Sequence, residues 1–381
     1  MNVAASVGTP AIEPLRRLET VQMLRGLAAM LVVYHHAGFL LVTTAASPPG
    51  QSLLVPTRAI AQLGAIGVDL FFVISGFVMA LSARRFLGPA GAGVFLAQRY
   101  IRIAPLFYLA TVLMFADYLR AGLPIDPIQI VNSLTFIPIF DDDTYSWPLH
   151  YLGWTLAFEF FFYVIVAAMI ATGYGGRHGL LLAILVALPI AGVVAPLPPI
   201  LWKVATNGLI WEFALGVLAC ILWEQRRLER LRPMFMVALA LFLIATPFAL
   251  HLAPEYQLAL GLEPVTGATT RLRSFYWGVP AFLFFCIVVG SAGLAEGAAT
   301  RLFKLLGDAS YSLYLSHLFV VMVIRAIHSR VGLPADLVVI ATLVLSAIVG
   351  VIVYRLAEKP MLAAGQRAIR EWSKRHMRAA L

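Results

Sequence analysis

Long apolar runs separated by short polar segments repeat along the chain, and most of these runs are long enough to cross a bilayer as a helix. Apolar residues fill each run without alternating with polar ones, so the pattern predicts α-helices and excludes a membrane barrel. The expected fold is an all-α polytopic membrane protein with about ten transmembrane helices around a central cavity. The predicted spans lie at about 25–45, 60–82, 100–119, 150–172, 179–195, 203–223, 234–252, 275–293, 309–329 and 335–357.

These spans predict an N-terminal cytoplasmic arm at 1–23, a transmembrane domain at 24–358 and a basic cytoplasmic tail at 359–381. The first run is too long for the apolar region of a signal peptide, so we expect it to be retained, although Ala45-Ala46-Ser47 would permit cleavage. The segment 127–140 is apolar but short, and it contains two prolines. We expect a re-entrant or interfacial piece there, with an eleventh span as the alternative.

Basic residues gather in the loops that ten spans would place on one side of the membrane. This asymmetry is the positive-inside pattern, and it predicts that both termini are cytoplasmic. Acidic residues fall in the opposite loops, at Asp126, Asp141-Asp142-Asp143, Glu255 and Glu263. The basic loop residues are Arg84, Arg85, Arg99, Arg102, Arg177, Arg226, Arg227, Arg230, Arg232, Arg301 and Lys304, followed by the tail from Lys359 to Arg378.

Composition agrees with a membrane protein, because hydrophobic residues make up 61% of the chain and charged residues 12%, about half the charged fraction of a soluble domain. The formal net charge of +9 could indicate a nucleic-acid partner. The basic residues lie between apolar runs, however, so topology explains them and we expect no nucleic acid. Cys220 and Cys286 both lie inside apolar runs, and no spacing predicts a disulfide or a metal site.

The first apolar run carries ionisable residues, which are costly at membrane depth and by default mark a functional interior. Arg25 and His36 are eleven residues apart, so they share nearly one helix face about 16 Å apart along the axis. An imidazole can take a proton from a hydroxyl or hold an acyl group transiently. We therefore predict His36 as a catalytic residue with Arg25 at the mouth of the site, and His35 as its neighbour in the cavity.

Two further motifs contribute charged and polar groups. Arg99 and Arg102 share a helix face at i, i+3, and a pair of guanidiniums suits phosphate, so we expect anion binding beyond ordinary topology. Asp69, inside an apolar run, needs a basic partner and is a candidate for orienting the imidazole. Ser75, before a glycine, is more consistent with close helix packing than with nucleophilic attack.

The remaining candidates lie later in the chain and would complete a polar cavity. Glu159 places a carboxylate in an aromatic-rich run and is a second candidate for orienting the imidazole. Tyr314 and His317 share a helix face at i, i+3 with Tyr311 nearby, and Glu358 ends the last span. Glu159 could alternatively bind only an interhelical partner, and Glu358 could pair with a cytoplasmic arginine.

Together these motifs resemble the membrane-bound acyltransferase-3 family, from about residue 20 to residue 362. The first two are the specific ones, whereas Arg-x-x-Arg alone would mean little. The motifs occur in the family's order: Arg25-x10-His36, Gly67-Val-Asp-Leu-Phe-Phe-Val-Ile-Ser-Gly-Phe77, Arg99-x-x-Arg102 with Ile103 and Pro105, Trp154-Thr-Leu with Glu159, Ser310-Tyr-Ser-Leu-Tyr-Leu-Ser-His317, and Glu358-Lys-Pro360.

The resemblance implies transfer of an acyl group, commonly acetyl from acetyl-CoA, to a hydroxyl of a carbohydrate, glycolipid or polysaccharide, with no metal. It implies that His36 is the essential histidine, Arg25 its paired arginine, and Arg99 and Arg102 the acyl-CoA-binding pair. A threonine follows Trp154 where serine is usual. No hydrolase-like domain follows the last span, so the chain resembles the stand-alone form. The expected location is the bacterial inner membrane.

The residues and the resemblance predict one direction of transfer. Acyl-CoA would dock on Arg99 and Arg102 from the cytosol, and its thioester would reach inward to His36. The acceptor would come from the outer side. The alternative is a non-enzymatic transporter or flippase of a glycan or lipid, because intramembrane Asp, His and Glu also suit a proton relay. Such a transporter would usually show paired interrupted helices in two related halves, and none is apparent.

Overall fold

A computed structural model describes residues 12–43, 52–141, 144–195, 200–252, 269–291 and 297–379. The predicted acidic residues Asp142, Asp143, Glu255 and Glu263 and the cleavage sequence 45–47 lie outside these ranges.

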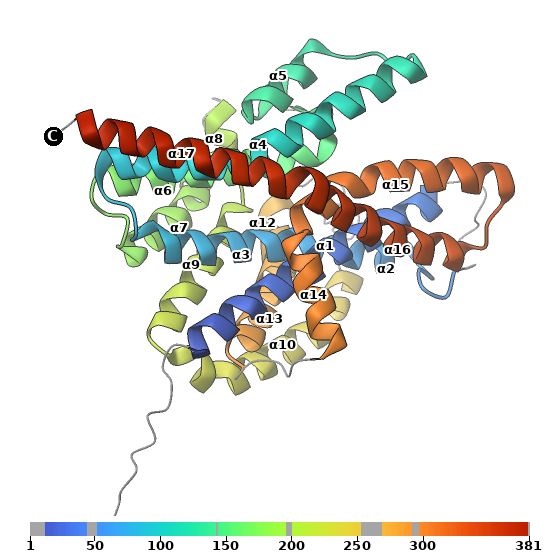
Figure 1. Cartoon of the computed structure of the whole chain (residues 1–381). Helices are drawn as coiled ribbons and strands as arrows, with labels where there is room; N and C mark the ends of the chain where they lie inside the picture. Colours follow the sequence, from blue (N-terminus) through green and yellow to red (C-terminus); the bar gives the residue numbers. More distant parts are fainter. Residues whose placement is uncertain are drawn as a thin grey trace, which may run out of the picture.

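Figure 1 shows a bundle of long helices, with α5 (Pro127–Thr135) standing away from it beyond the end of α4. The main helices are α1 (Ile12–Thr43), α2 (Arg58–Leu63), α3 (Ile66–Ala83), α4 (Gly88–Ala121), α6 (Trp154–Ala171), α7 (His178–Val194), α8 (Ile200–Ala205), α9 (Ile210–Glu224), α10 (Arg227–Leu252), α12 (Thr269–Arg273), α13 (Val279–Val289), α14 (Ala298–Asp308), α15 (Ser310–Val331), α16 (Ala335–Val353) and α17 (Lys359–Ala379).

Helix lies in the described part of every predicted span, and the multi-pass membrane class is confirmed. Among the described residues, seven stretches are long and apolar enough to cross a membrane, whereas α7 and α9 have 17 and 15 residues. The count of ten and the location of the termini therefore stay predictions. The seven stretches are Glu19–Leu41, Ile60–Ala83, Gly88–Ala121, Tyr151–Ala171, Thr270–Val289, Ser310–Val331 and Ala335–Trp372.

Large apolar side chains cover the outward faces of several helices. Val112 and Leu119 on α4 are 62% and 61% exposed, and Ile244 on α10 is 74% exposed. Soluble monomers rarely expose contiguous apolar surface of this kind. Lipid is therefore the environment that these faces fit.

Two buried glycines let α3 and α9 cross in backbone contact. A Cβ atom added at Gly76 would collide with the carbonyl oxygen of Phe213, and one added at Gly216 would collide with that of Val73. Small residues at a crossing allow close van der Waals packing, which drives helix association in lipid. This crossing fixes α3, which contributes Ser75 and Val68 to the interior.

The segment after α4 departs from a purely helical fold. Asp126 caps α5, because its carboxylate accepts a hydrogen bond from the backbone N–H of Ile128 at 2.8 Å. An antiparallel hairpin follows, made of β1 (Ile139–Asp141) and β2 (Thr144–Ser146), in which Phe140 pairs with Tyr145. The all-α class still describes the fold, with these two three-residue strands as a local exception. The segment predicted as a re-entrant or interfacial piece contains a short helix followed by the first strand of this hairpin.

Both ends of the chain are more helical than the predicted arm and tail. The first helix begins at Ile12, inside the predicted arm. At the other end, α16 continues through a π-helical turn at Tyr354–Glu358 into α17, so helix runs from Ala335 to Ala379. Figure 1 shows this long red helix passing α4, and Gly365 on α17 touches Ile101 on α4.

The helix α14 was not among the predicted spans, because it is short and amphipathic. It packs against the first turns of α1, where Lys304 pairs with Glu19 at 2.7 Å and Asp308 accepts a hydrogen bond from Gln22 at 2.7 Å. These contacts hold Arg25 on α1 beside Ser310 at the start of α15.

Candidate active site

A cavity of about 110 Å³ lies among α1, α3, α4, α6 and α15, and we call it the arginine cavity. Seven residues predicted from the sequence line it, although they come from five helices far apart in the chain. They are Arg25, Ser75, Arg99, Arg102, Glu159, Tyr311 and Tyr314. Tyr163 and Ser310 also line it, and the sequence reasoning had not assigned them a role.

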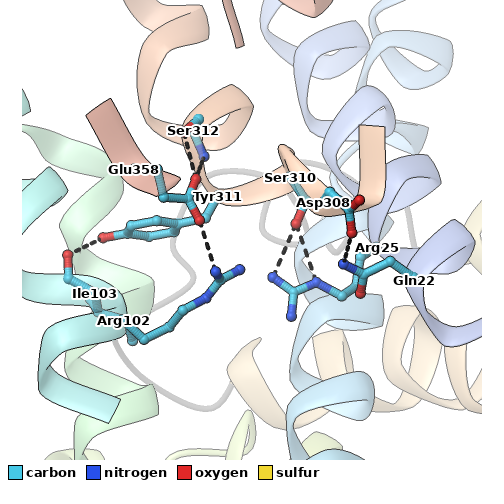
Figure 2. A network of polar contacts seen from close by, with 9 residues as sticks. All are labelled: Gln22, Arg25, Arg102, Ile103, Asp308, Ser310, Tyr311, Ser312 and Glu358. Carbon is cyan, nitrogen blue, oxygen red and sulfur yellow. Dashed lines mark hydrogen bonds and ion pairs between the residues drawn. The ribbon is translucent and has the colours of Figure 1, made fainter. Parts of the chain in front are cut away.

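A hydrogen-bonding serine on α15 and a carboxylate in the π-helical turn Tyr354–Glu358 hold two of the arginines in place (Figure 2). Arg102 pairs with Glu358 at 2.9 Å, and Glu358 accepts hydrogen bonds from the backbone N–H and the hydroxyl of Ser312. The Nε and Nη2 atoms of Arg25 donate to the Ser310 hydroxyl at 3.2 and 3.0 Å. Figure 2 shows the two guanidiniums pointing toward one another, so the cavity concentrates positive charge.

The remaining charges leave the arginine cavity with an excess of positive charge. Arg99 stacks on the Phe95 ring with its guanidinium carbon 5.4 Å from the ring centroid, and its buried Nε has no hydrogen-bond partner among the described residues. Glu159 accepts a hydrogen bond from Tyr163 at 2.9 Å. Three arginines thus face two carboxylates, Glu159 and Glu358, an arrangement that favours an anion.

A second cavity of about 390 Å³ contains the predicted histidines, and we call it the histidine cavity. Both His35 and His36 line it. His35 is tied to the Ala61 carbonyl at 3.1 Å through Nδ1 and stands edge-on to His36. Several further lining residues had no place in the sequence prediction, namely Phe39, Trp147, Tyr151 and Arg273.

The hydrogen bonds around His36 define which of its nitrogens is basic. Its Nδ1 lies 2.9 Å from the Val32 carbonyl, which can only accept, so Nδ1 carries the proton. The same N–H lies 3.2 Å from Nε2 of His317, whose own Nδ1 donates to the Leu313 carbonyl. The Nε2 atom of His36 is therefore the unprotonated nitrogen, and the Tyr151 hydroxyl donates to it.

The position of Tyr151 depends on the residue before it. His150 precedes the spanning stretch that begins at Tyr151, and its side chain is fully buried. Burial lowers the pKa of His150 to about 4, so its ring is neutral at neutral pH. Its Nε2–H donates to the Leu315 carbonyl at 3.1 Å. This bond ties the segment carrying Tyr151 to α15, which carries His317.

The two carboxylates predicted to orient the His36 ring, Asp69 and Glu159, bind other partners in this structure. Asp69 is buried and pairs with Arg273 at 2.9 Å, while Glu159 binds Tyr163 in the arginine cavity. An intramembrane carboxylate seeks a basic partner, and Asp69 finds it in an arginine on α12. Among the described residues, the groups bonded to the His36 ring are the Val32 carbonyl, Tyr151 and His317.

The sequence predicted a single central cavity, and the described part of the interior contains two adjoining ones. Both are lined by Val68 and Tyr314, which therefore form the wall between them. The Tyr314 hydroxyl is bonded to the Thr155 hydroxyl at 2.9 Å and donates to the Leu152 carbonyl at 3.2 Å. These bonds hold its ring across the boundary between the arginine and histidine cavities.

One cluster in the described part of the chain has the spacing of a metal site. The donor atoms of His178, Cys220 and Glu224 lie within 4.8 Å of one another. Glu224 is already bound by Arg84 at 2.7 Å and by His178 at 3.1 Å. Its carboxylate charge is thereby satisfied without an ion, and the cluster lies outside both cavities.

The fold and the two cavities define a multi-pass membrane protein with a positively charged cavity next to an oriented histidine. Comparison with known families gives the particular class. Residues 19–355 match the family model described as "Acyltransferase domain", that of the acyltransferase-3 family. The chain belongs to this family, and it is a membrane-bound O-acyltransferase.

Two curated relatives show how far the similarity extends. The exopolysaccharide production protein ExoZ of Rhizobium meliloti (strain 1021) is 33% identical over 313 residues, covering 80% of this chain and 91% of ExoZ. YrhL of Bacillus subtilis (strain 168), named as a candidate peptidoglycan O-acetyltransferase, is 25% identical over 359 residues, covering 82% of this chain and 54% of YrhL. No solved structure matches the chain.

Proposed function

We propose that this enzyme moves an acyl group, acetyl above all, from acyl-CoA to a hydroxyl of a carbohydrate, polysaccharide or lipid-linked glycan. The observation that carries the proposal is that the arginine cavity adjoins the cavity holding the basic Nε2 of His36, with Val68 and Tyr314 lining both. The names of ExoZ and YrhL refer to exopolysaccharide and peptidoglycan, which supports a glycan acceptor.

The donor side of the proposed reaction uses the excess positive charge. Arginine binds phosphate through paired, charge-assisted hydrogen bonds. Arg99 and Arg102 bind the anionic part of acyl-CoA, and the thioester extends past Tyr314 toward His36. Arg25 lines the same cavity beside Ser310, where its guanidinium adds positive charge. The protein lies in the bacterial inner membrane with this side facing the cytosol.

The acceptor side uses the unprotonated nitrogen of His36. The acceptor hydroxyl takes the place of the Tyr151 hydroxyl on Nε2, and His36 removes its proton as the hydroxyl oxygen attacks the thioester carbonyl. The carbon–sulfur bond breaks, the carbon–oxygen ester bond forms, and the departing thiolate takes the proton back from Nε2. The Nδ1–H bonds to Val32 and His317 hold the ring in this orientation throughout. Alternatively, the acyl group passes first from the thioester to Nε2 of His36, with release of the CoA thiol, and then from Nε2 to the acceptor hydroxyl.

Substitution of His36 tests the proposal. Purified protein in lipid nanodiscs receives radiolabelled acetyl-CoA and a glycan acceptor, and both labelled product and free CoA are measured. His36→Ala is expected to lose at least about a hundredfold in transfer, the usual contribution of a positioned acid–base group. Mass spectrometry of surface glycans with and without the gene then identifies the acceptor by a gain of one acyl unit.

The matched control is His35→Ala, because this neighbour binds the Ala61 carbonyl and has no bond to the acceptor position. It is expected to keep most of the transfer activity. A stable His36→Ala protein with full transfer would refute the catalytic role. Movement of an unmodified glycan across vesicles without any acyl donor would favour a transporter instead.

A further inference from the structure

A third cavity of about 350 Å³ lies outside the bundle core, between the N-terminal half of α4 and the α17 helix. We call it the α4–α17 groove. Both helices contribute basic, amide and aliphatic side chains to its lining. They are Gln98, Arg99, Ile101, Arg102, Leu362, Gln366, Ile369 and Arg370.

The groove is positively charged. Three arginines line it, and none of the residues that line it is acidic. Arg102 is paired with Glu358, but Arg99 and Arg370 have no carboxylate partner among the described residues. The buried Nε of Arg99 also lacks a hydrogen-bond acceptor in this part of the chain. A buried donor without an acceptor is costly, and an anionic ligand would supply one.

The groove and the arginine cavity adjoin one another. Arg99 and Arg102 line both spaces. A ligand could therefore rest a bulky anionic end in the groove and pass a narrow arm between these two side chains into the bundle. The two cavities and the groove form a series, with the arginine pair at one boundary and Tyr314 at the other.

We propose that the α4–α17 groove binds the phosphorylated nucleotide end of the acyl donor, with Arg370 and Gln366 on α17 as binding residues. This inference rests on the proposed use of acyl-CoA. Guanidiniums suit the phosphates, the amides of Gln98 and Gln366 can hydrogen-bond a base or ribose, and Ile101, Leu362 and Ile369 offer an apolar surface to the base. The volume of the groove lies within the range of small-ligand sites.

The experiment compares two arginines on one helix. Arg370 lines the groove, whereas Arg367, three residues earlier, is exposed and does not line it. Binding of CoA, 3′-dephospho-CoA and pantetheine is measured by calorimetry on the full-length protein in nanodiscs. Arg370→Gln is expected to weaken CoA binding by about tenfold, the loss of one charge-assisted hydrogen bond. Arg367→Gln carries the same change in net charge and is expected to bind CoA as the wild type does.

The truncated probes distinguish the groove from general electrostatics. The difference in affinity between Arg370→Gln and Arg367→Gln should be largest for CoA, smaller for 3′-dephospho-CoA and absent for pantetheine. Equal affinities of Arg370→Gln and Arg367→Gln for CoA would overturn the groove inference alone, provided that the wild type still transfers acyl groups from acyl-CoA. A wild type that neither binds nor uses acyl-CoA would overturn the proposed function and this inference together.

An anionic lipid headgroup presents the same phosphate chemistry, so the measurements are made in neutral phosphatidylcholine and in discs containing phosphatidylglycerol. A nucleotide site predicts that Arg370→Gln weakens CoA binding in both lipids. If Arg370→Gln leaves CoA binding in neutral discs unchanged and alters only the association with anionic lipid, the groove is a lipid site and the proposal is wrong.

Discussion

The protonation pattern of the His36 ring follows from neighbours that are remote in sequence. Val32 lies one helical turn away on α1, but Tyr151 and His317 come from the segment before α6 and from α15. Sequence reasoning could select His36, because an ionisable residue at membrane depth is unusual. It could not find Tyr151, since a tyrosine near the end of a span is also typical of a membrane interface.

At the scale of single residues, Arg273 tests how much a buried ion pair contributes to stability. It pairs with the buried Asp69, next to the buried Glu212. Arg273→Met leaves both carboxylates without their cation and is expected to lower the free energy of unfolding by about 3–5 kcal/mol, the cost of breaking a buried pair. The measurement is thermal or denaturant unfolding in detergent.

Arg84→Met provides the comparison, since Arg84 pairs with Glu224 and its side chain is 52% exposed. Its removal should cost about 1 kcal/mol or less, as expected for a surface ion pair. Equal losses of unfolding free energy in the two variants would show that the buried Asp69–Arg273 pair contributes no more to stability than a surface ion pair does.

At the scale of elements, the apolar runs predicted where helices lie better than how the helices end or join. Composition marked the run at 60–82, but not its break between α2 and α3, and the long α16–α17 helix extends beyond the expected end of the last span. The amphipathic α14 and the β1–β2 hairpin were missed for one reason. Both are too short to produce a spanning apolar run, and tertiary contacts define them.

The α3–α9 crossing gives a prediction at this scale. Gly76→Ala would place its Cβ against the Phe213 backbone carbonyl, where neither rigid helix can yield easily. Such overpacking is expected to lower the stability by about 1–3 kcal/mol. The difference in unfolding temperature between the variant and the wild type measures this loss.

Gly93→Ala on α4 is the matched substitution, because nothing lies within 4 Å of a Cβ atom added there. Alanine is the better helix former by about 1 kcal/mol, so this variant should be as stable as the wild type or more stable. A Gly76→Ala protein that also gains stability would contradict the close crossing.

At the scale of the whole molecule, most of the predicted site residues line the interior cavities, but the sequence did not predict which cavity each one lines. Seven of the predicted residues meet in the arginine cavity, while His35 and His36 lie in another cavity across Val68 and Tyr314. Periodicity predicts which side chains share a helix face, but it does not specify which faces meet in space. The division into two cavities therefore had no signal in the chain.

Substitution of Tyr314 tests whether its side chain separates the arginine cavity from the histidine cavity. Tyr314→Ala removes the ring between the cavities and is expected to raise acetyl-CoA hydrolysis in the absence of an acceptor by several-fold, because water near His36 gains access to the thioester. The rate of CoA release, followed with a thiol reagent, measures the effect. Tyr314→Phe keeps the ring and should stay close to the wild-type rate. If the alanine variant does not hydrolyse faster, the side chain is not a barrier.

The length of the final helix has a consequence for how a water-soluble donor reaches the enzyme. The 38-residue stretch Ala335–Trp372 is about 57 Å long, nearly twice the roughly 30 Å of a hydrocarbon core. Its far portion must therefore protrude into the aqueous phase or lie along the headgroups, and it carries Gln366 and Arg370 there. If the donor is the proposed acyl-CoA, it can thus dock from the aqueous phase without first entering lipid.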